Sequence, residues 1–355
     1  MAMLHAIDHA LDRALGGRTR GARAQWVVPL GAWVTGDGTL HVEGRVLSSA
    51  FRARDVPPGL RRMWALICRL ETDEVAGARV TARSSAGEVS GRTDAEGYFA
   101  LELAARVGAP IRAPFLPVEV RSEAGEEAVT MLATVPGSRA RRLVVSDVDD
   151  TVLVAHATSR LRQTYHVLLT HDGEREAVPR AAELYQALAR GSGRARHNPI
   201  AYVSSSPTNV AGVIATSLAA HGFPEGPLLL KDFGVDEQKV LKEGHVEHKI
   251  ARIARVIDAW PKLDVLLVGD TGQSDPAVFE HAAARWPDRI RAAWLRDAPG
   301  GDAKRADAAL EKVASVGAET LRFADVAEAR AWALERGWIE QAAAHDNAAH
   351  DDDDA

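Results

Sequence analysis

The spacing of hydrophobic residues divides the chain into segments of different structure. Near the N-terminus, apolar residues recur every three or four positions, which predicts a short amphipathic helix ending at Gly16-Gly17. Its apolar face consists of Met3, Leu4, Ile7, Leu11 and Leu15. We expect this helix to pack on the protein's own core rather than on a membrane, because it carries acids and has no aromatic residue.

Between about residues 26 and 135 the hydrophobic period shortens to that of β-strands. Gly, Pro and Asp separate five predicted strands, at residues 39–46, 78–83, 98–103, 118–121 and 128–133. Many short strands with such punctuation predict an all-β sandwich.

After Pro136-Gly137-Ser138 the pattern changes to alternating strands and helices. Apolar runs predict strands at residues 143–147, 199–204, 228–230, 264–269 and 290–295. Helical patterns lie between them at residues 180–190, 210–221, 249–260 and 276–286. Such repeated units predict an α/β fold with a doubly wound, parallel, Rossmann-like sheet. Beyond Pro299 we expect a helical region with a small strand at 320–323 and a last helix at 326–336.

These patterns divide the chain into four parts. Residues 1–25 hold the amphipathic helix and a basic linker, residues 26–138 the β-sandwich and residues 139–340 the α/β domain. Residues 341–355 include four consecutive aspartates at 351–354, and we interpret them as a disordered acidic tail rather than a metal site.

Composition limits the classes to which the protein can belong. In 355 residues, 46% are hydrophobic and 26% charged, which is typical of a globular chain long enough for two domains. The formal net charge of -6 argues against a nucleic-acid-binding surface. Cys68 is the single cysteine and excludes an intramolecular disulfide. The sequence contains neither a transmembrane stretch nor a secretory signal, so we expect a cytoplasmic protein.

The first candidate site follows the strand predicted at 143–147. This apolar run ends in Asp147, Asp149, Asp150 and Thr151. Carboxylates this close repel one another, so we expect a cation of the Mg²⁺ type among them. An EF-hand calcium loop is excluded, because Val152 stands where that loop needs glycine and Thr158 where it needs glutamate.

Three further segments place polar groups at the same edge of the predicted sheet. The strand at 199–204 leads into Ser204-Ser205-Ser206, where a hydroxyl and helix-start amides suit phosphate oxygens. Lys249 opens a predicted helix and can neutralise phosphate charge. The strand at 264–269 is followed by Asp270 and Asp275, two more carboxylates for a cation.

The order of these motifs resembles that of the haloacid dehalogenase superfamily. Its four motifs match Asp147/Asp149/Thr151, Ser204, Lys249 and Asp270/Asp275. Over residues 143–297 the chain is more closely similar to the phosphatidate phosphatases of the actin-patch-protein type, which are relatives of the lipins. One position differs from the family pattern: that family usually has Trp after the Ser-Pro of its second motif, whereas this chain has Thr208.

The resemblance implies a division of roles among the motif residues. Asp147 is then the nucleophile that forms an aspartyl-phosphate, and Asp149 the acid that protonates the leaving group and later activates water. Mg²⁺ is then held by Asp147, Asp270 and the backbone carbonyl of Asp149, with Asp275 binding directly or through water. Ser204, Ser205, Lys249 and Thr151 are the implied phosphate-binding and loop-orienting residues.

The predicted sandwich resembles a second family. Residues 77–82 and 91–99 are similar to the transthyretin-like or carboxypeptidase-regulatory type of immunoglobulin-like module, whose motif is a turn followed by an aromatic plug. This part has no cluster of catalytic groups, so we interpret it as structural or as a surface that orients a partner. Several arginines outnumber the nearby acids, and we interpret them as a solvated face: Arg45, Arg52, Arg54, Arg61, Arg62 and Arg69.

The lengths of the connecting segments bear on the substrate. Residues 152–197 and 207–248 are too short to hold a separate cap domain, so an open site suits a bulky substrate. The histidines of the first segment, His156, His166 and His171, are not expected to be ligands. We expect phosphatidate to be the leading substrate, with the protein contacting the membrane surface peripherally. A phosphatase for phosphoproteins or soluble esters and a non-catalytic binding protein are the alternatives, and the oligomeric state stays open.

Overall fold

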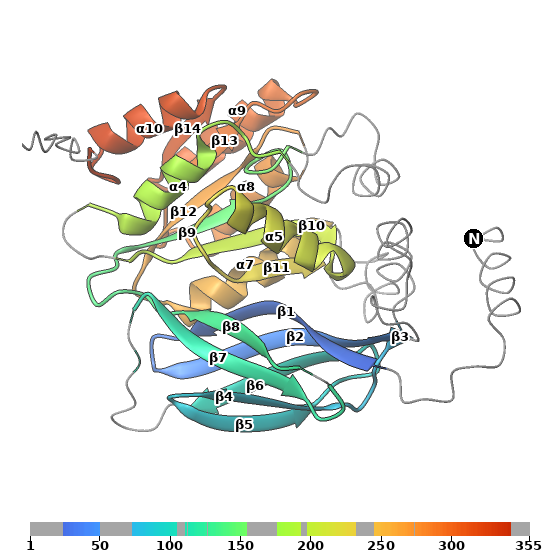
Figure 1. Cartoon of the computed structure of the whole chain (residues 1–355). Helices are drawn as coiled ribbons and strands as arrows, with labels where there is room; N and C mark the ends of the chain where they lie inside the picture. Colours follow the sequence, from blue (N-terminus) through green and yellow to red (C-terminus); the bar gives the residue numbers. More distant parts are fainter. Residues whose placement is uncertain are drawn as a thin grey trace, which may run out of the picture.

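The computed structural model describes two stacked parts of the chain (Figure 1). It covers residues 24–49, 73–104, 111, 113–125, 127–154, 176–192, 197–231, 245–272 and 274–341. We call residues 24–135 the β unit and residues 142–341 the α/β unit. The predicted boundaries of the four domains stay a prediction.

Eight strands lie in the part of the β unit that the structure describes. They are β1 (Ala24–Val34), β2 (Thr39–Ser49), β3 (Asp73–Glu74), β4 (Arg79–Ser84), β5 (Gly87–Arg92), β6 (Tyr98–Ala104), β7 (Phe115–Ser122) and β8 (Val129–Thr134). The five predicted strands are confirmed as β2, β4, β6, β7 and β8. The strand β1 was not predicted, because Pro29 and Gly31 interrupt its apolar pattern at the point where its pairing with β2 shifts register. The strand β5 has no fully buried residue and therefore gives no apolar signal.

The strands of the β unit enclose an apolar core. They pair in the order β3-β2-β1-β8-β7-β4-β5, and β6 pairs with β2. The expected sandwich is therefore one continuous mixed sheet, in which β1 and β8 pair in parallel at Trp33 and Thr134. Figure 1 shows β4, β5 and β6 below β1, β2 and β8, and the side chains between them form the core. The strand β7 alternates buried and exposed residues, as a strand with one face on a core does.

The α/β unit contains a parallel sheet of six strands. They are β9 (Arg142–Asp147), β10 (Ile200–Pro207), β11 (Leu228–Lys231), β12 (Asp264–Asp270), β13 (Ile290–Arg296) and β14 (Glu319–Phe323). The order is β11-β10-β9-β12-β13-β14 and every pair is parallel. This is the doubly wound order, which reverses direction between β9 and β12. The predicted parallel sheet is confirmed, including its small last strand.

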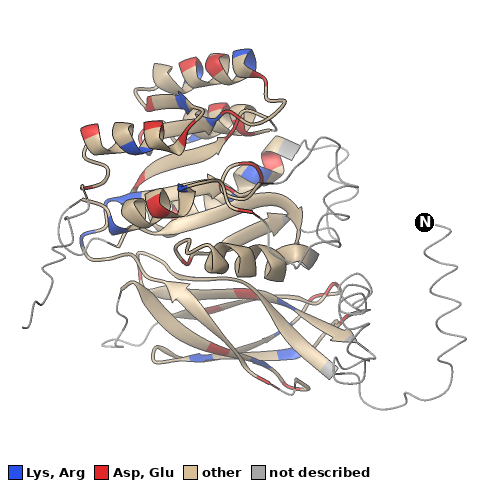
Figure 2. Cartoon of the chain, turned by 45° about the horizontal axis from the view of Figure 1, so that its top comes forward, with Lys and Arg blue, Asp and Glu red and all other residues tan. Residues whose placement is uncertain are grey.

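Helices cover both faces of this sheet. One face packs against α4 (Ala181–Arg190), α5 (Ala211–Ala220) and α10 (Val326–Glu335). The other face packs against α7 (His245–Ala259), α8 (Asp275–Arg285) and α9 (Ala303–Ser315). The predicted helices are confirmed, although α7 begins four residues before Lys249. Figure 2 shows charged residues of both signs along the outer helices, whereas the strands beneath them are mostly tan.

The β unit docks on the α/β unit through β1. Trp33 is buried in the core that contains α7, and Trp260 Nε1 donates a hydrogen bond to the Val34 carbonyl oxygen at 2.8 Å. Nearby, Gly36 N donates to the Ala259 carbonyl oxygen at 2.8 Å. An ion pair between Arg255 and Glu43 adds a charged contact. Buried aromatic and backbone contacts of this kind fix how the two units sit together.

Several expectations lie outside the described residues. They concern the N-terminal helix, Cys68, the arginines from Arg52 to Arg69, the connecting segments around His156 to His171 and 232–244, and the acidic tail. Arg45 is described, and it is buried rather than part of a solvated face. Among the helices that the structure describes, we find none with the length and apolar character needed to cross a bilayer.

Close packing beside the parallel sheet predicts that a side chain at Gly226 would destabilise the protein. A Cβ atom there would lie 2.0 Å from the Ile200 backbone oxygen on β10, so Gly226→Ala requires a backbone shift. We expect a loss of about 1–3 kcal/mol in the free energy of unfolding, measured by chemical denaturation. Gly212→Ala is the matched control, since its Cβ would meet nothing within 4 Å on α5. It should stabilise by up to about 1 kcal/mol, and equal effects of the two changes would contradict this packing.

Candidate active site

Three neighbouring strands deliver polar residues to one edge of the parallel sheet. The strands β9, β10 and β12 are buried along almost their whole lengths, because their apolar residues face helices on both sides. Each one ends in residues with oxygen-bearing side chains: Asp147, Ser204, Ser206 and Asp270. This edge lies where the strand order reverses, which is the position at which open α/β sheets place their sites.

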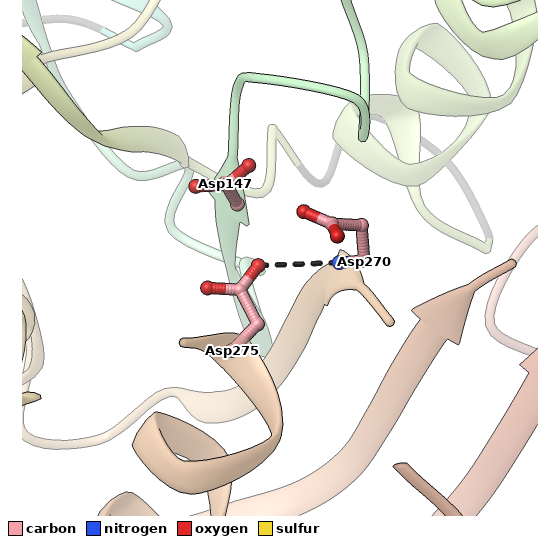
Figure 3. Close-up of side chains that lie close together, drawn as sticks. All are labelled: Asp147, Asp270 and Asp275. Atoms are coloured by element: carbon pink, nitrogen blue, oxygen red, sulfur yellow. Dashed lines mark hydrogen bonds between the residues drawn. The ribbon is translucent and has the colours of Figure 1, made fainter. Parts of the chain in front are cut away.

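A cluster of three buried carboxylates forms at this edge (Figure 3). Oxygen atoms of Asp147, Asp270 and Asp275 lie within 4.8 Å of one another. Asp275 is in the first turn of α8, where a carboxylate is favourable, and its Oδ2 accepts a hydrogen bond from the Asp270 backbone at 3.1 Å. Gly269 makes this approach possible, since a Cβ there would lie 2.4 Å from Asp275 Oδ2. We call these three residues the carboxylate cluster.

Lys249 is the cation that the structure places in the carboxylate cluster. Its Nζ donates to Asp147 Oδ1 at 2.6 Å and to Asp275 Oδ1 at 2.5 Å, and it is buried on α7. Burial opposes its charge, but the attraction of Asp147 and Asp275 is greater and raises the pKa of Lys249. The lysine is therefore charged. The sequence predicted the lysine at this edge, but not its pairing with two carboxylates.

One lysine cannot neutralise three carboxylates. Burial, followed by repulsion from Asp275, raises the pKa of Asp147 well above its usual value. Burial and Asp275 likewise raise the pKa of Asp270 to about 7. In the absence of another positive charge, the carboxylate cluster thus tends to retain a proton at neutral pH.

Unpartnered oxygens show that the carboxylate cluster fits a further cation. Among the described residues, Asp147 Oδ2 and Asp270 Oδ2 are buried without a hydrogen-bond partner. A buried carboxylate oxygen without a donor is costly unless a cation binds it. Several carboxylate oxygens close together are the donor set that Mg²⁺ prefers. The residues present therefore fit a magnesium ion between Asp147 and Asp270.

Asp149 lies in a different environment from Asp147. Its Oδ2 accepts hydrogen bonds from Ser204 Oγ at 2.9 Å and from Ser206 Oγ at 3.0 Å. Ser204 Oγ also accepts from the Ser206 backbone N–H at 2.9 Å. Two carboxylates two residues apart are thus held in contrasting ways, Asp147 by a lysine and Asp149 by neutral hydroxyls.

Ser206 is a site residue that the sequence reasoning missed. We expected the strand to end at residue 204 and helix-start amides to follow, but β10 continues to Pro207. Side chains alternate along a strand, so Ser204 and Ser206 face Asp149 together while Ser205 is exposed. The alternation of side chains along a strand was the signal in the sequence that could have identified Ser206. Ser205 does not take part in this contact, and its role in phosphate binding stays a prediction.

The loop after β9 is held by contacts from outside the motif. Asp150 has a positive φ of 57°, and its carbonyl oxygen accepts a hydrogen bond from Arg296 Nε at 2.8 Å. Thr151 is buried, and its hydroxyl has no hydrogen-bond partner among the described residues. Behind the loop, Ser146 Oγ donates to the Asp147 carbonyl oxygen at 2.6 Å. No pattern in the sequence pointed to Arg296, because it comes from β13, about 150 residues away along the chain.

Comparison with known proteins supports the resemblance drawn from the motifs. Residues 142–297 match the family model described as "Phosphatidate phosphatase APP1, catalytic domain". Over 157 residues the chain is 26% identical to phosphatidate phosphatase APP1 of Saccharomyces cerevisiae, a match that covers 43% of this chain and 25% of that protein. The chain thus spans about a quarter of the length of that relative. The expected resemblance to this type of phosphatidate phosphatase is confirmed.

Similar solved structures add little. The Pnkp1/Rnl/Hen1 complex is 12% identical with a TM-score of 0.32, and the match covers 48% of this chain and 50% of the other. A carbohydrate acetylesterase from Xanthomonas citri is 12% identical with a TM-score of 0.30, over 85% and 69% of the two chains. Scores this low establish no shared fold.

The raised pKa of Asp270 predicts how stability depends on pH without metal. The folded protein retains a proton up to about pH 7, whereas an unfolded aspartate loses it near pH 3.9. Between these values, rising pH lowers the free energy of unfolding by up to about 1.4 kcal/mol per pH unit. Urea denaturation in EDTA at several pH values should show this slope, and Asp270→Asn should have a smaller one.

Magnesium supplies the control for this experiment. At pH 7, Mg²⁺ should raise the unfolding temperature of the wild-type protein and have less effect on Asp270→Asn, because the variant lacks one charged ligand. Equal pH slopes in the two proteins, or equal responses to Mg²⁺, would contradict the assignment of Asp270 to the cation site.

Proposed function

We propose that this chain is a Mg²⁺-dependent phosphomonoesterase that acts through an aspartyl-phosphate on Asp147. The observation that carries this proposal is the contrast between Asp147 and Asp149. Lys249, and a cation when bound, would favour the ionised Asp147 that a nucleophile needs, whereas the hydroxyls of Ser204 and Ser206 orient Asp149 for proton transfer. The match of residues 142–297 to a phosphatidate phosphatase catalytic domain supports the same activity.

In the first step, a carboxylate oxygen of Asp147 attacks the phosphorus of a phosphomonoester. The bond between phosphorus and the ester oxygen breaks, and protonated Asp149 gives its proton to the departing alkoxide. The products are an alcohol and a phosphoryl group bonded to Asp147. Hydrogen bonds from Ser204 and Ser206 hold Asp149 in place for this transfer.

The second step regenerates the enzyme. Asp149, now ionised, takes a proton from a water molecule as the water oxygen attacks the phosphorus. The bond between phosphorus and Asp147 breaks, which returns the Asp147 carboxylate and releases inorganic phosphate. Asp149 ends the cycle protonated, as it began.

Positive charge near the transferring phosphoryl group comes from two sources. Lys249 is charged and already touches Asp147, so it lies beside the reacting atoms and stabilises charge that develops on phosphate oxygens. Mg²⁺, when bound, would be held by Asp147 and Asp270, with Asp275 and the Asp149 backbone carbonyl as further ligands, and would supply Lewis-acid charge neutralisation. Among the residues that the structure describes, Thr151 Oγ1 has no hydrogen-bond partner, and it is available to orient the loop or a phosphate oxygen.

The substrate and the setting are also part of the proposal. Phosphatidate is the substrate that the match to the Saccharomyces cerevisiae protein supports, with diacylglycerol and phosphate as products. We propose a cytoplasmic enzyme that contacts membranes peripherally. We further propose a haloacid dehalogenase-like fold for the α/β unit, supported by its strand order, and an immunoglobulin- or transthyretin-like fold for the β unit.

Substitution of the two aspartates tests the catalytic roles. Asp147→Asn should abolish Mg²⁺-dependent phosphatase activity, and Asp149→Asn should lower kcat by about 10²–10⁴-fold through loss of acid-base catalysis. Asp150→Asn is a matched control in the same loop, since asparagine tolerates the positive φ of this residue. It should retain kcat within about threefold. Full activity in Asp147→Asn would remove the proposed nucleophile.

A second experiment tests the substrate. Initial rates on vesicles containing phosphatidate should exceed those on a soluble aryl phosphate at equal phosphate concentration, and both should vanish in EDTA. The reverse preference would favour a phosphatase for soluble esters. Hydrolysis of neither compound in Mg²⁺ would favour the non-catalytic alternative.

A further inference from the structure

A hydrogen bond joins the β unit to the segment that holds Asp149. The Tyr98 hydroxyl, at the start of β6, lies 2.6 Å from Thr208 Oγ1. Thr208 is buried and comes two residues after Ser206, directly after β10 ends at Pro207. The aromatic motif of the β unit, which we interpreted from the sequence as structural or as part of a surface that orients a partner, therefore reaches the edge of the candidate active site.

The turn before β6 fixes the position of Tyr98. Asp94 Oδ1 accepts hydrogen bonds from the backbone N–H groups of Glu96 and Tyr98, both at 2.9 Å. Gly97 has a φ of +79°, and a Cβ there would lie 2.6 Å from the Val46 backbone oxygen, so the turn requires glycine. Such a turn sets the direction in which β6 starts.

Arg45 holds the ring of Tyr98. Its guanidinium carbon lies 4.5 Å from the centre of the Tyr98 ring, and the side chain is buried. Arg45 Nε donates to the Glu96 carbonyl oxygen at 2.8 Å, and the guanidinium pairs with Glu74 at 2.9 Å. Tyr98 is therefore a preorganised group rather than a free side chain at an interface.

On the other side of the Tyr98–Thr208 hydrogen bond, the end of β10 has little support from strand pairing. The pairing of β10 with β11 shifts register between Val203 and Pro207, so residues 204–206 lie outside the regular ladder. Two of these residues, Ser204 and Ser206, have the hydroxyls that bind Asp149. The hydrogen bond between Tyr98 and Thr208 holds the chain two residues beyond Ser206 and thus fixes the downstream end of the segment.

We propose that Tyr98 is a positioning residue for the phosphatase reaction, acting through Thr208 on Ser204 and Ser206 and thereby on Asp149. This inference rests on the proposed function. It gives the β unit a part in catalysis, although the unit contributes no reacting group. Docking of the two units does not require this bond, because Trp33, Trp260 and the Arg255–Glu43 pair already join β1 and β2 to α7.

Removal of either hydroxyl should lower kcat with little change in KM. We expect a loss of about tenfold in Tyr98→Phe and in Thr208→Val, since small displacements of catalytic groups reduce rate more than binding. The double variant should lose about the same factor as each single one, because both remove one hydrogen bond. Thr208→Ser keeps the hydroxyl and should retain most of the activity. Glu43→Gln, which removes an ion pair between the units at α7, is the matched control and should retain kcat.

A measurement that does not depend on activity completes the test. Hydrogen–deuterium exchange of the peptide spanning residues 200–210 should be faster in Tyr98→Phe and Thr208→Val than in wild type and Glu43→Gln. Unchanged exchange in this peptide overturns the inference, even if the wild-type protein hydrolyses no phosphomonoester. Wild-type kcat in both variants, or an equal loss in Glu43→Gln, overturns it while leaving the proposed function intact. If Tyr98→Phe fails to fold, the comparison of Thr208→Val with Thr208→Ser decides.

Discussion

The repulsion among the buried carboxylates is the constraint on which the site depends. Asp147, Asp270 and Asp275 come from the ends of two adjacent parallel strands and the start of a helix, so the fold itself forces them together. Lys249 offsets part of their charge, and the rest calls for a bound cation or a proton. The same low-dielectric setting that makes the cluster costly without a cation would strengthen its attraction for a doubly charged ion and for a phosphate bound beside it.

This constraint explains why contacts far from the motif residues matter. A loop that carries strongly interacting charges needs a rigid frame, or the charges would move apart. Arg296 holds the Asp150 carbonyl from β13, and Ser146 holds the Asp147 carbonyl from within β9. Tyr98 extends this frame into the β unit through Thr208. Two sheets that are separate in the sequence therefore support one edge, at which the motif residues gather.

Most of the fold could be predicted from the sequence, and the features that the prediction missed have local causes. The strands of the parallel sheet are continuous apolar runs, such as Val265 to Val268, which remain recognisable because both faces are buried. The strand β1 could not be recognised, because Pro29 and Gly31 interrupt its apolar pattern. They lie where its pairing with β2 shifts register, and that pairing depends on residues elsewhere in the chain. In the site, the motif aspartates and Lys249 could be predicted. Ser205 was predicted in place of Ser206, because the predicted end of β10 came too early in the chain.

The sequence by itself determined the order of the elements and the residue types at the strand ends, since hydrophobic periodicity and motif spacing are local properties. Only the tertiary structure decided which of these residues touch. It paired Lys249 with two carboxylates, gave Asp149 to two serine hydroxyls and brought Tyr98 to Thr208 across 110 residues. These contacts depend on strand order and on the docking of the two units. Both are set by the burial of many distant side chains at once, which no local pattern records.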